Sequence, residues 1–181
     1  NIEVQNTSWT DTLTSGIIET DTFYIANSGQ ANLVFSINNT ISWLSLIPSS
    51  GSVPVNDSLA IVLNISTIGV YAGVYTNSFS IISNDLTNPE IIFNLDLNVL
   101  GSPELTVVDN INFGTVDVGT TGNYSLILEN SGTDTLFIDS IELSSLYFAN
   151  SGQNSFFILP GQTDTLPLEF SPSLSILYSG I

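Results

Sequence analysis

The chain has 181 residues, 43% of them hydrophobic, and a net charge of −17 at pH 7 with no lysine or arginine. Because Lys and Arg hold nucleic-acid phosphates and anionic headgroups, we expect no nucleic-acid partner, and no apolar run is long enough for membrane insertion. The absence of cysteine and histidine removes disulfides, thiolate metal sites and the usual nucleophile and general base, so we expect no enzyme.

Short segments of alternating apolar and polar residues follow one another along the chain. In the clearest one, Phe93, Leu95 and Leu97 alternate with Asn94 and Asp96, which is typical of a strand with one buried and one wet face. Strands are predicted, in chain order, at residues 22–26, 33–37, 59–65, 78–82, 91–99, 105–108, 124–128, 136–141 and 165–170. No helical periodicity with caps occurs, so the chain is expected to be all-β.

Turn signals separate these segments about every ten residues, as in a β-sandwich. They lie at residues 27–29 (NSG), 48–51 (PSSG), 83–85 (SND), 130–132 (NSG), 150–152 (NSG) and 160–161 (PG). Residues 22–29 align with residues 125–132, and Tyr71-Ala72-Gly73 aligns with Tyr178-Ser179-Gly180. The sequence therefore predicts two tandem immunoglobulin-like antiparallel β-sandwiches, residues 1–101 and 102–181.

The second predicted sandwich lacks its last two strands. After Gly73 the first unit has two further predicted strands, whereas Gly180 is followed by Ile181 only. Burying five apolar side chains of such a strand contributes about 1.5–3 kcal/mol each, and natural sheets avoid open apolar edges. We therefore expect an open slot, filled either by continuation of the same polypeptide or by a strand from a neighbouring subunit.

Several of these segments resemble known families. In the second unit, residues 113–119 (FGTVDVG), 128–132 (LENSG) and 170–172 (FSP) resemble the ASH or hydin-type immunoglobulin-like domains of bacterial choice-of-anchor surface proteins. In the first unit, residues 42–51 and 73–85 also resemble BACON domains, which are often attached to carbohydrate-active proteins. The resemblance implies an immunoglobulin-like fold and a surface setting, and its motifs contain no catalytic residues.

Four aromatic residues are candidates for a binding or structural role. Trp9 and Trp43 are able to stack on sugar rings, which makes carbohydrate binding an alternative function, although Trp43 alternates with Ile41 in a predicted strand and so suits the core. Tyr71 and Tyr178 stand in equivalent Tyr-x-Gly positions. Each is interpreted as a structural tyrosine whose hydroxyl ties a corner to the backbone.

Oxygen ligands suit calcium, so a structural calcium ion is a second hypothesis. Its candidate ligand groups are Asp109, Asn110 and Asp117, or residues 83–85 with Asn88 and Glu90. The spaced acidic pattern of a calcium loop is missing, and acidic residues in turns ordinarily bond to their own backbone. Five Asn-x-Ser/Thr sequons, at Asn6, Asn38, Asn56, Asn64 and Asn123, would accept glycans only in a glycosylating secretory pathway.

These observations predict a non-enzymatic structural or spacer module of a larger extracellular surface, adhesin-like or filament protein. The alternative is a carbohydrate-binding module of a secreted carbohydrate-active protein. An exterior location is expected because a chain without Lys or Arg offers no site to trypsin-like proteases, although a compositional bias of the source organism would have the same effect. The expected partners are other domains of the same polypeptide or neighbouring subunits at the open edge of the second domain, and glycans in the alternative.

Overall fold

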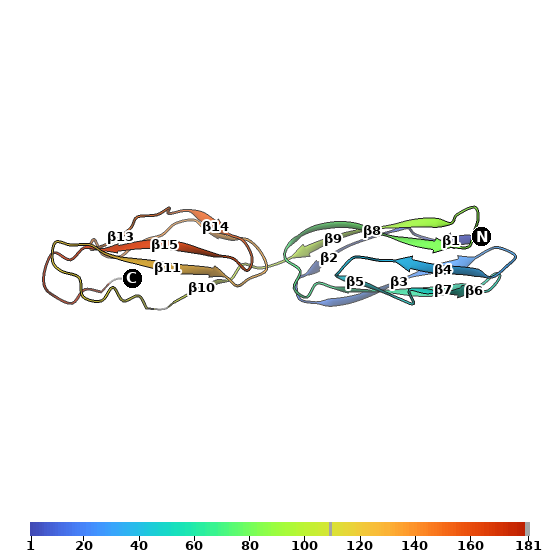
Figure 1. The fold of residues 1–181 in the computed structure, drawn as a ribbon, viewed down its shortest axis with the longest axis horizontal. Helices are drawn as coiled ribbons and strands as arrows, with labels where there is room; N and C mark the ends of the chain where they lie inside the picture. Colours follow the sequence, from blue (N-terminus) through green and yellow to red (C-terminus); the bar gives the residue numbers. More distant parts are fainter. Residues whose placement is uncertain (109, 180–181) are drawn as a thin grey trace. The chain divides into compact units, whose positions relative to one another are not determined.

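The computed structural model describes residues 1–108 and 110–179 and divides into two compact units, Asn1–Leu100 and Gly101–Ile181 (Figure 1). Every regular element among the described residues is a β-strand. The all-β prediction is therefore confirmed, and each unit is described by itself below.

Unit 1 is a sandwich of two sheets. Its four-stranded sheet has the order β1 (Ile2–Val4), β3 (Ile18–Asn27), β7 (Ser58–Ser66) and β5 (Leu44–Ile47). Its five-stranded sheet has the order β2 (Ser8–Thr14), β9 (Glu90–Leu100), β8 (Gly73–Ser83), β4 (Leu33–Asn38) and β6 (Ser50–Val53). All pairs are antiparallel as predicted except β2 with β9, which is parallel.

The core of unit 1 lies between these sheets, where the inward residues of the alternating strands meet. The side chain of Phe23 on β3 contacts the other sheet, where its ring centroid lies 4.9 Å from that of Phe93. The Phe93 ring in turn stacks on Phe79, with 4.8 Å between ring centroids. Strand β9 alone contributes four residues that are at most 2% exposed, namely Phe93, Leu95, Leu97 and Val99. The period-2 pattern of this strand thus fixes which of its faces is buried.

Unit 2 consists of a four-stranded sheet and a two-stranded sheet. The first has the order β10 (Leu105–Val107), β11 (Gly122–Asn130), β15 (Thr163–Phe170) and β13 (Phe148–Asn150), and the second pairs β12 (Leu136–Ile138) with β14 (Phe156–Ile158). The buried core consists of Leu126, Leu128, Ile158, Leu166 and Leu168.

Some predicted strand limits are wrong. The strand predicted over 136–141 ends at Ile138, and the strand predicted around Trp43 begins only at Leu44, as β5. Five strands lie outside the predictions: β1, β2, β6, β13 and β14. Four of these five have only three or four residues, which is too short for a period-2 pattern to stand out. In β2, the polar Asp11 stands between Trp9 and Leu13 on the inward face and hides the apolar period.

In each unit an asparagine closes the turn that leads from one sheet to the other, after β3 in unit 1 and after β11 in unit 2. In unit 1 the Asn27 side chain is 1% exposed, and its Nδ2 donates to the carbonyl oxygens of Ala31 (2.8 Å) and Val53 (3.0 Å) while its Oδ1 accepts from Gly29 N (2.9 Å). A Cβ atom on Gly29 would collide with the backbone nitrogen of Asn1, so the NSG turn requires glycine there. The motif therefore joins β3 to the turn that follows it and to β6.

Candidate interaction site on the second unit

The four-stranded sheets of the two units have the same strand order and register. The pair Leu105 and Asn130 in unit 2 corresponds to Ile2 and Asn27 in unit 1, and each begins the short strand at the sheet edge. Similarly, Phe148 pairs with Phe170 where Leu44 pairs with Ile65. This half of the sandwich is therefore complete in both units.

The second sheet of unit 2 stops where its counterpart in unit 1 meets β8. Leu136 pairs with Ile158 as Leu33 pairs with Val53, so β12 and β14 correspond to β4 and β6. Strand β4 begins to pair with β8 at Phe35 and continues to Asn38, whereas β12 ends at Ile138. Within residues 110–179 no strand takes the place of β8 or β9.

The segment that corresponds to β2 also lacks a strand partner. Strand β2 forms its whole ladder with β9, and the equivalent residues in unit 2, from about Ile111 to Asp117, are not in a strand. Ile111 and Phe113 still pack against the core through their side chains, and the Phe113 ring lies 5.7 Å from that of Phe170. This segment keeps its position through side-chain packing without a sheet.

A groove of about 1030 Å³, lined by both polar and apolar residues, lies on unit 2 beside residues 110–118. Its walls include Phe113, Leu143, Phe148, Leu168, Phe170 and Tyr178. The residues that β8 and β9 would cover are less buried in unit 2 than in unit 1. Leu136 and Ile138 are partly exposed, whereas their counterparts Leu33 and Phe35 are 3% and 2% exposed. The expected open slot is thus present among the described residues.

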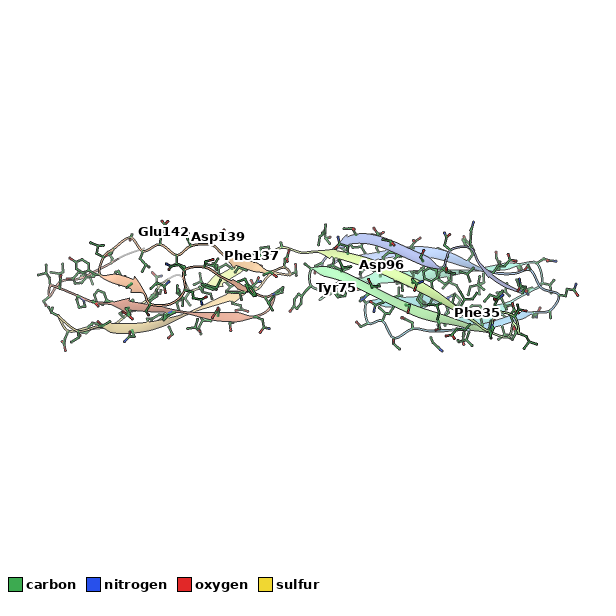
Figure 2. All side chains as sticks on the ribbon, turned by 90° about the horizontal axis from the view of Figure 1, so that it is seen from above. Phe35, Tyr75, Asp96, Phe137, Asp139 and Glu142 are labelled. Carbon is green, nitrogen blue, oxygen red and sulfur yellow. The ribbon has the colours of Figure 1, made fainter. Side chains whose placement is uncertain are left out.

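Acidic side chains accompany the groove and the end of β12. Asp117 is one of its lining residues, and Asp139 and Glu142 follow β12, where Figure 2 labels them beside Phe137. All three carboxylates are exposed. A ligand of this side of the unit therefore meets a mixed polar and apolar surface with negative charge nearby.

Tyr178 has the structural role that its sequence position predicts. Its hydroxyl accepts from Leu174 N (2.7 Å) and Ser173 N (3.2 Å) and donates to Leu174 O (3.1 Å). The centroid of its ring lies 4.6 Å from that of Tyr147 and 5.3 Å from that of Phe170, and residues 174–179 form part of the wall of the groove. The prediction for Tyr71 is not met: its side chain is 47% exposed, and at this corner the hydroxyl of Tyr75 donates to the Tyr71 carbonyl oxygen (2.9 Å).

The two tryptophans lie in different parts of unit 1. Trp43 is 7% exposed and belongs to the core, as predicted, although it stands in the turn directly before β5 and outside the strand. Trp9 is on β2 and packs partly buried against the same core. A sugar ring would thus find at most part of the Trp9 ring accessible, while the face of Trp43 is covered by protein.

Among the described residues, no group of three or more His, Cys, Asp or Glu side chains is placed to hold a metal ion, which leaves the two candidate groups of mixed carboxylate and amide ligands as a hypothesis. Asp109 lies outside those residues, which leaves the first group incomplete. In the second group, Asp85 accepts hydrogen bonds from the backbone nitrogens of Ile2 (2.9 Å) and Thr87 (2.9 Å). These bonds, led by the one from Ile2, hold the pKa of Asp85 below its usual value. The carboxylate therefore ties the β8–β9 loop to β1.

The sequons differ in how the structure presents them. Asn6, Asn38, Asn56 and Asn123 are exposed, and Asn56 stands in a turn with φ of 57°. Asn64 is partly buried within the central strand β7, as expected for the least suitable acceptor.

Among the residues that the structure describes, no helix has the length and apolar character of a membrane span.

Comparison with known proteins finds a family match over most of unit 2. Residues 103–177 match the HYDIN/CFA65/VesB-like Ig-like domain family. The predicted resemblance to ASH and hydin-type domains is confirmed by this match. A search of curated proteins returned no match. Together with the two immunoglobulin-like sandwiches, the match describes a structural or interaction module.

Solved structures with a similar fold share little sequence with the chain. The ASH/PapD-like domain 7 of human CEP192 is 15% identical, with 55% of this chain and 84% of that chain covered and a TM-score of 0.47. A protein of unknown function from Porphyromonas gingivalis W83 is 14% identical, with 94% and 83% covered and a TM-score of 0.47. The CupB2 chaperone of Pseudomonas aeruginosa is 11% identical, with 94% and 89% covered and a TM-score of 0.42. With TM-scores below 0.5, nothing about the function of these proteins is transferred to this chain.

Proposed function

We propose that the chain is a non-enzymatic spacer module of a larger extracellular surface, adhesin-like or filament protein. The observation that carries this proposal is the path of the chain through unit 1. Ile2 pairs with Asn27 at the last residue of β3, whereas Leu100 accepts a hydrogen bond from Ser15 N (2.7 Å), close to Ile18 at the first residue of β3. The chain therefore enters the unit at one end of β3 and leaves it at the other (Figure 1).

This path separates the two ends of unit 1 by the length of a strand. Strand β3 has ten residues, which at about 3.3 Å per residue corresponds to roughly 30 Å. A module whose ends lie at opposite poles adds its full length to the polypeptide, as a spacer requires. The immunoglobulin-like match of the following unit supports a repeated module, and the lack of cleavage sites for trypsin-like proteases supports a location outside the cell.

Labelling of intact cells tests the location. An antibody against the chain should bind unpermeabilised cells of the source organism, and an antibody against a cytoplasmic protein serves as the control. Signal that appears only after permeabilisation would overturn the proposal.

A glycan array with the purified chain tests the carbohydrate alternative. That alternative requires a bound glycan whose signal is lost in the Trp9→Ala variant while the fold is kept.

We also propose that the groove of unit 2 is completed by a two-stranded segment with the chemistry of β8 and β9. In unit 1 those strands lie between β4 and β2; the counterpart of β2, residues 111–117, lines the groove, and the counterpart of β4 is β12. They place Phe79, Ile81, Phe93, Leu95, Leu97 and Val99 in the core. The segment is supplied either by the same polypeptide or by a neighbouring subunit that adds its strands to the open edge.

Appending a second copy of residues 73–100 directly after Ser179 tests this completion. The extended chain should protect the backbone amides of residues 136–141 from hydrogen exchange, because they would gain the partner that β8 gives β4. The matched control carries serine at the inward positions of the appended copy, those of Phe93, Leu95, Leu97 and Val99. Equal exchange in both versions would contradict the proposal. The mass of the native protein distinguishes the two sources: a polypeptide heavier than 19.4 kDa indicates the same chain, and polymers of the 19.4 kDa chain indicate a neighbour.

A further inference from the structure

We propose that unit 1 resists tension through the parallel pair of β2 and β9. This inference rests on the proposed spacer function, because only a module in a linear array is pulled from its two ends. Strand β2 is the first long strand of unit 1 and β9 is its last strand. The two pair over seven residues, from Ser8 with Asn94 to Thr14 with Leu100. Their relative direction decides how a pulling force acts on these bonds.

Tension on the unit pulls β2 and β9 past each other along their common axis. The N-terminal side of the chain pulls β2 toward Ser8, and the C-terminal side pulls β9 toward Leu100. Since the strands are parallel, these are opposite directions along one ladder, and the interstrand bonds, which run across the strands, are all strained together. An antiparallel pair joined to the same two ends would instead open one bond at a time.

The ladder is continued by one hydrogen bond beyond each end of the paired residues. Asn94 N donates to Thr7 O (2.9 Å) at one end, and Ser15 N donates to Leu100 O (2.7 Å) at the other. In a parallel ladder the backbone N–H groups of successive residues point alternately toward the partner strand and away from it. Between these two bonds, the N–H groups of Trp9, Asp11 and Leu13 therefore point toward β9, and those of Thr10 and Thr12 point toward the open edge. The bonds of β2 to β9 are thus regularly spaced over its whole length.

Side-chain packing supports the same pair. Leu13 is 5% exposed, and Trp9 packs against the core, so sliding β2 would also pull two large apolar side chains out of their contacts. Strand β9 is held on its other side by ten residue pairs with β8. Strand β1 has only three pairs with β3. Under tension we therefore expect β1 to detach first and the β2–β9 ladder to set the force at which the unit opens.

Single-molecule pulling on the full chain tests the direction of loading, because a chain without cysteine accepts handles at chosen positions. Handles at Gln5→Cys and Ser102→Cys load β2 and β9 in shear. Handles at Ile17→Cys and Ser102→Cys lie just after the C-terminal ends of β2 and β9, which are paired with each other. Pulling on these handles separates the two strands from that end and opens the ladder bond by bond. The rupture force of unit 1 should be severalfold higher in the first geometry. Equal rupture forces in the two geometries would overturn the proposal.

A pair of neighbouring proline variants tests which strand contact sets the force. Asp11→Pro removes an N–H from the β9 side, whereas Thr12→Pro removes one from the open edge, where it donates to the Asp11 side chain (2.6 Å). Shear rupture should fall in Asp11→Pro and stay at the wild-type force in Thr12→Pro. An equal loss in both variants would contradict the proposal. These measurements use the isolated chain, so a failed cell-surface labelling experiment leaves their outcome unaffected.

Discussion

Asn130 makes in the second unit the hydrogen bonds that Asn27 makes in the first. Its Nδ2 donates to Asp134 O (2.8 Å) and Ile158 O (2.9 Å), and its Oδ1 accepts from Gly132 N (3.0 Å). Both side chains are at most 1% exposed. The NSG turn is therefore repeated because it joins two strands and a turn through one buried amide.

Replacing either buried asparagine should destabilise its own unit. Asn27→Ala or Asn130→Ala leaves several buried backbone groups without a partner, at about 1–3 kcal/mol for each group. We expect unfolding free energy to fall by about 2–4 kcal/mol in the affected unit, as measured by urea denaturation. Asn150 stands in a third NSG turn, where its Oδ1 accepts from Gly152 N (2.8 Å) among exposed residues. Asn150→Ala is thus the matched control and should cost less than about 1 kcal/mol.

The repeat of the NSG turn was visible in the sequence, and with it the two-unit organisation and the strands that follow a clear alternation. Strand β9 illustrates why, since each of its inward residues from Phe93 to Val99 is apolar. The parallel partner of β9 was not predicted, because Asp11 in β2 breaks the apolar face and strand pairing over 80 residues leaves no local trace. Likewise, Tyr71 and Tyr178 occupy matching positions, yet only Tyr178 finds backbone groups within reach of its hydroxyl.

The two units should unfold at different temperatures. Among the described residues, β8 and β9 give unit 1 six buried side chains that have no counterpart in unit 2. Each such side chain contributes about 1.5–3 kcal/mol, so unit 2 should melt first. Trp9 and Trp43 both lie in unit 1, and tryptophan fluorescence therefore follows that unit alone. Far-UV circular dichroism should show an earlier transition that the tryptophan signal lacks; one shared transition would contradict this.

Added salt should stabilise the chain. With 17 acidic residues and no basic side chain, the charges mainly repel, and raising ionic strength to about 0.5 M shortens the screening length well below its value of about 10 Å at 0.1 M. Melting temperature should rise with NaCl, and moderate acidification from pH 7 to pH 5 should act in the same direction. A comparison of CaCl2 with NaCl at equal ionic strength separates screening from a specific site. A larger rise with calcium would support the structural calcium hypothesis.

Asp85 should oppose this general trend below pH 4. Its hydrogen bonds from Ile2 N and Thr87 N lower the pKa of the folded state beneath the ordinary 3.8. A lowered folded-state pKa means that the charged form stabilises the fold above the unfolded pKa and that this contribution is lost as pH falls through the folded value. Asp85→Asn should therefore reduce the stability of unit 1 at pH 7, and the difference from wild type should shrink toward zero in strong acid.

The matched control for this pH dependence is Glu19→Gln, which removes one exposed charge at the start of β3. Since the whole chain is negative, losing that charge should leave unit 1 equally stable or slightly more stable at pH 7, in contrast to Asp85→Asn. Urea denaturation followed by tryptophan fluorescence at pH 7 and in strong acid measures both effects. If Asp85→Asn were as stable as Glu19→Gln at pH 7, the bond between the β8–β9 loop and Ile2 would not contribute to the fold.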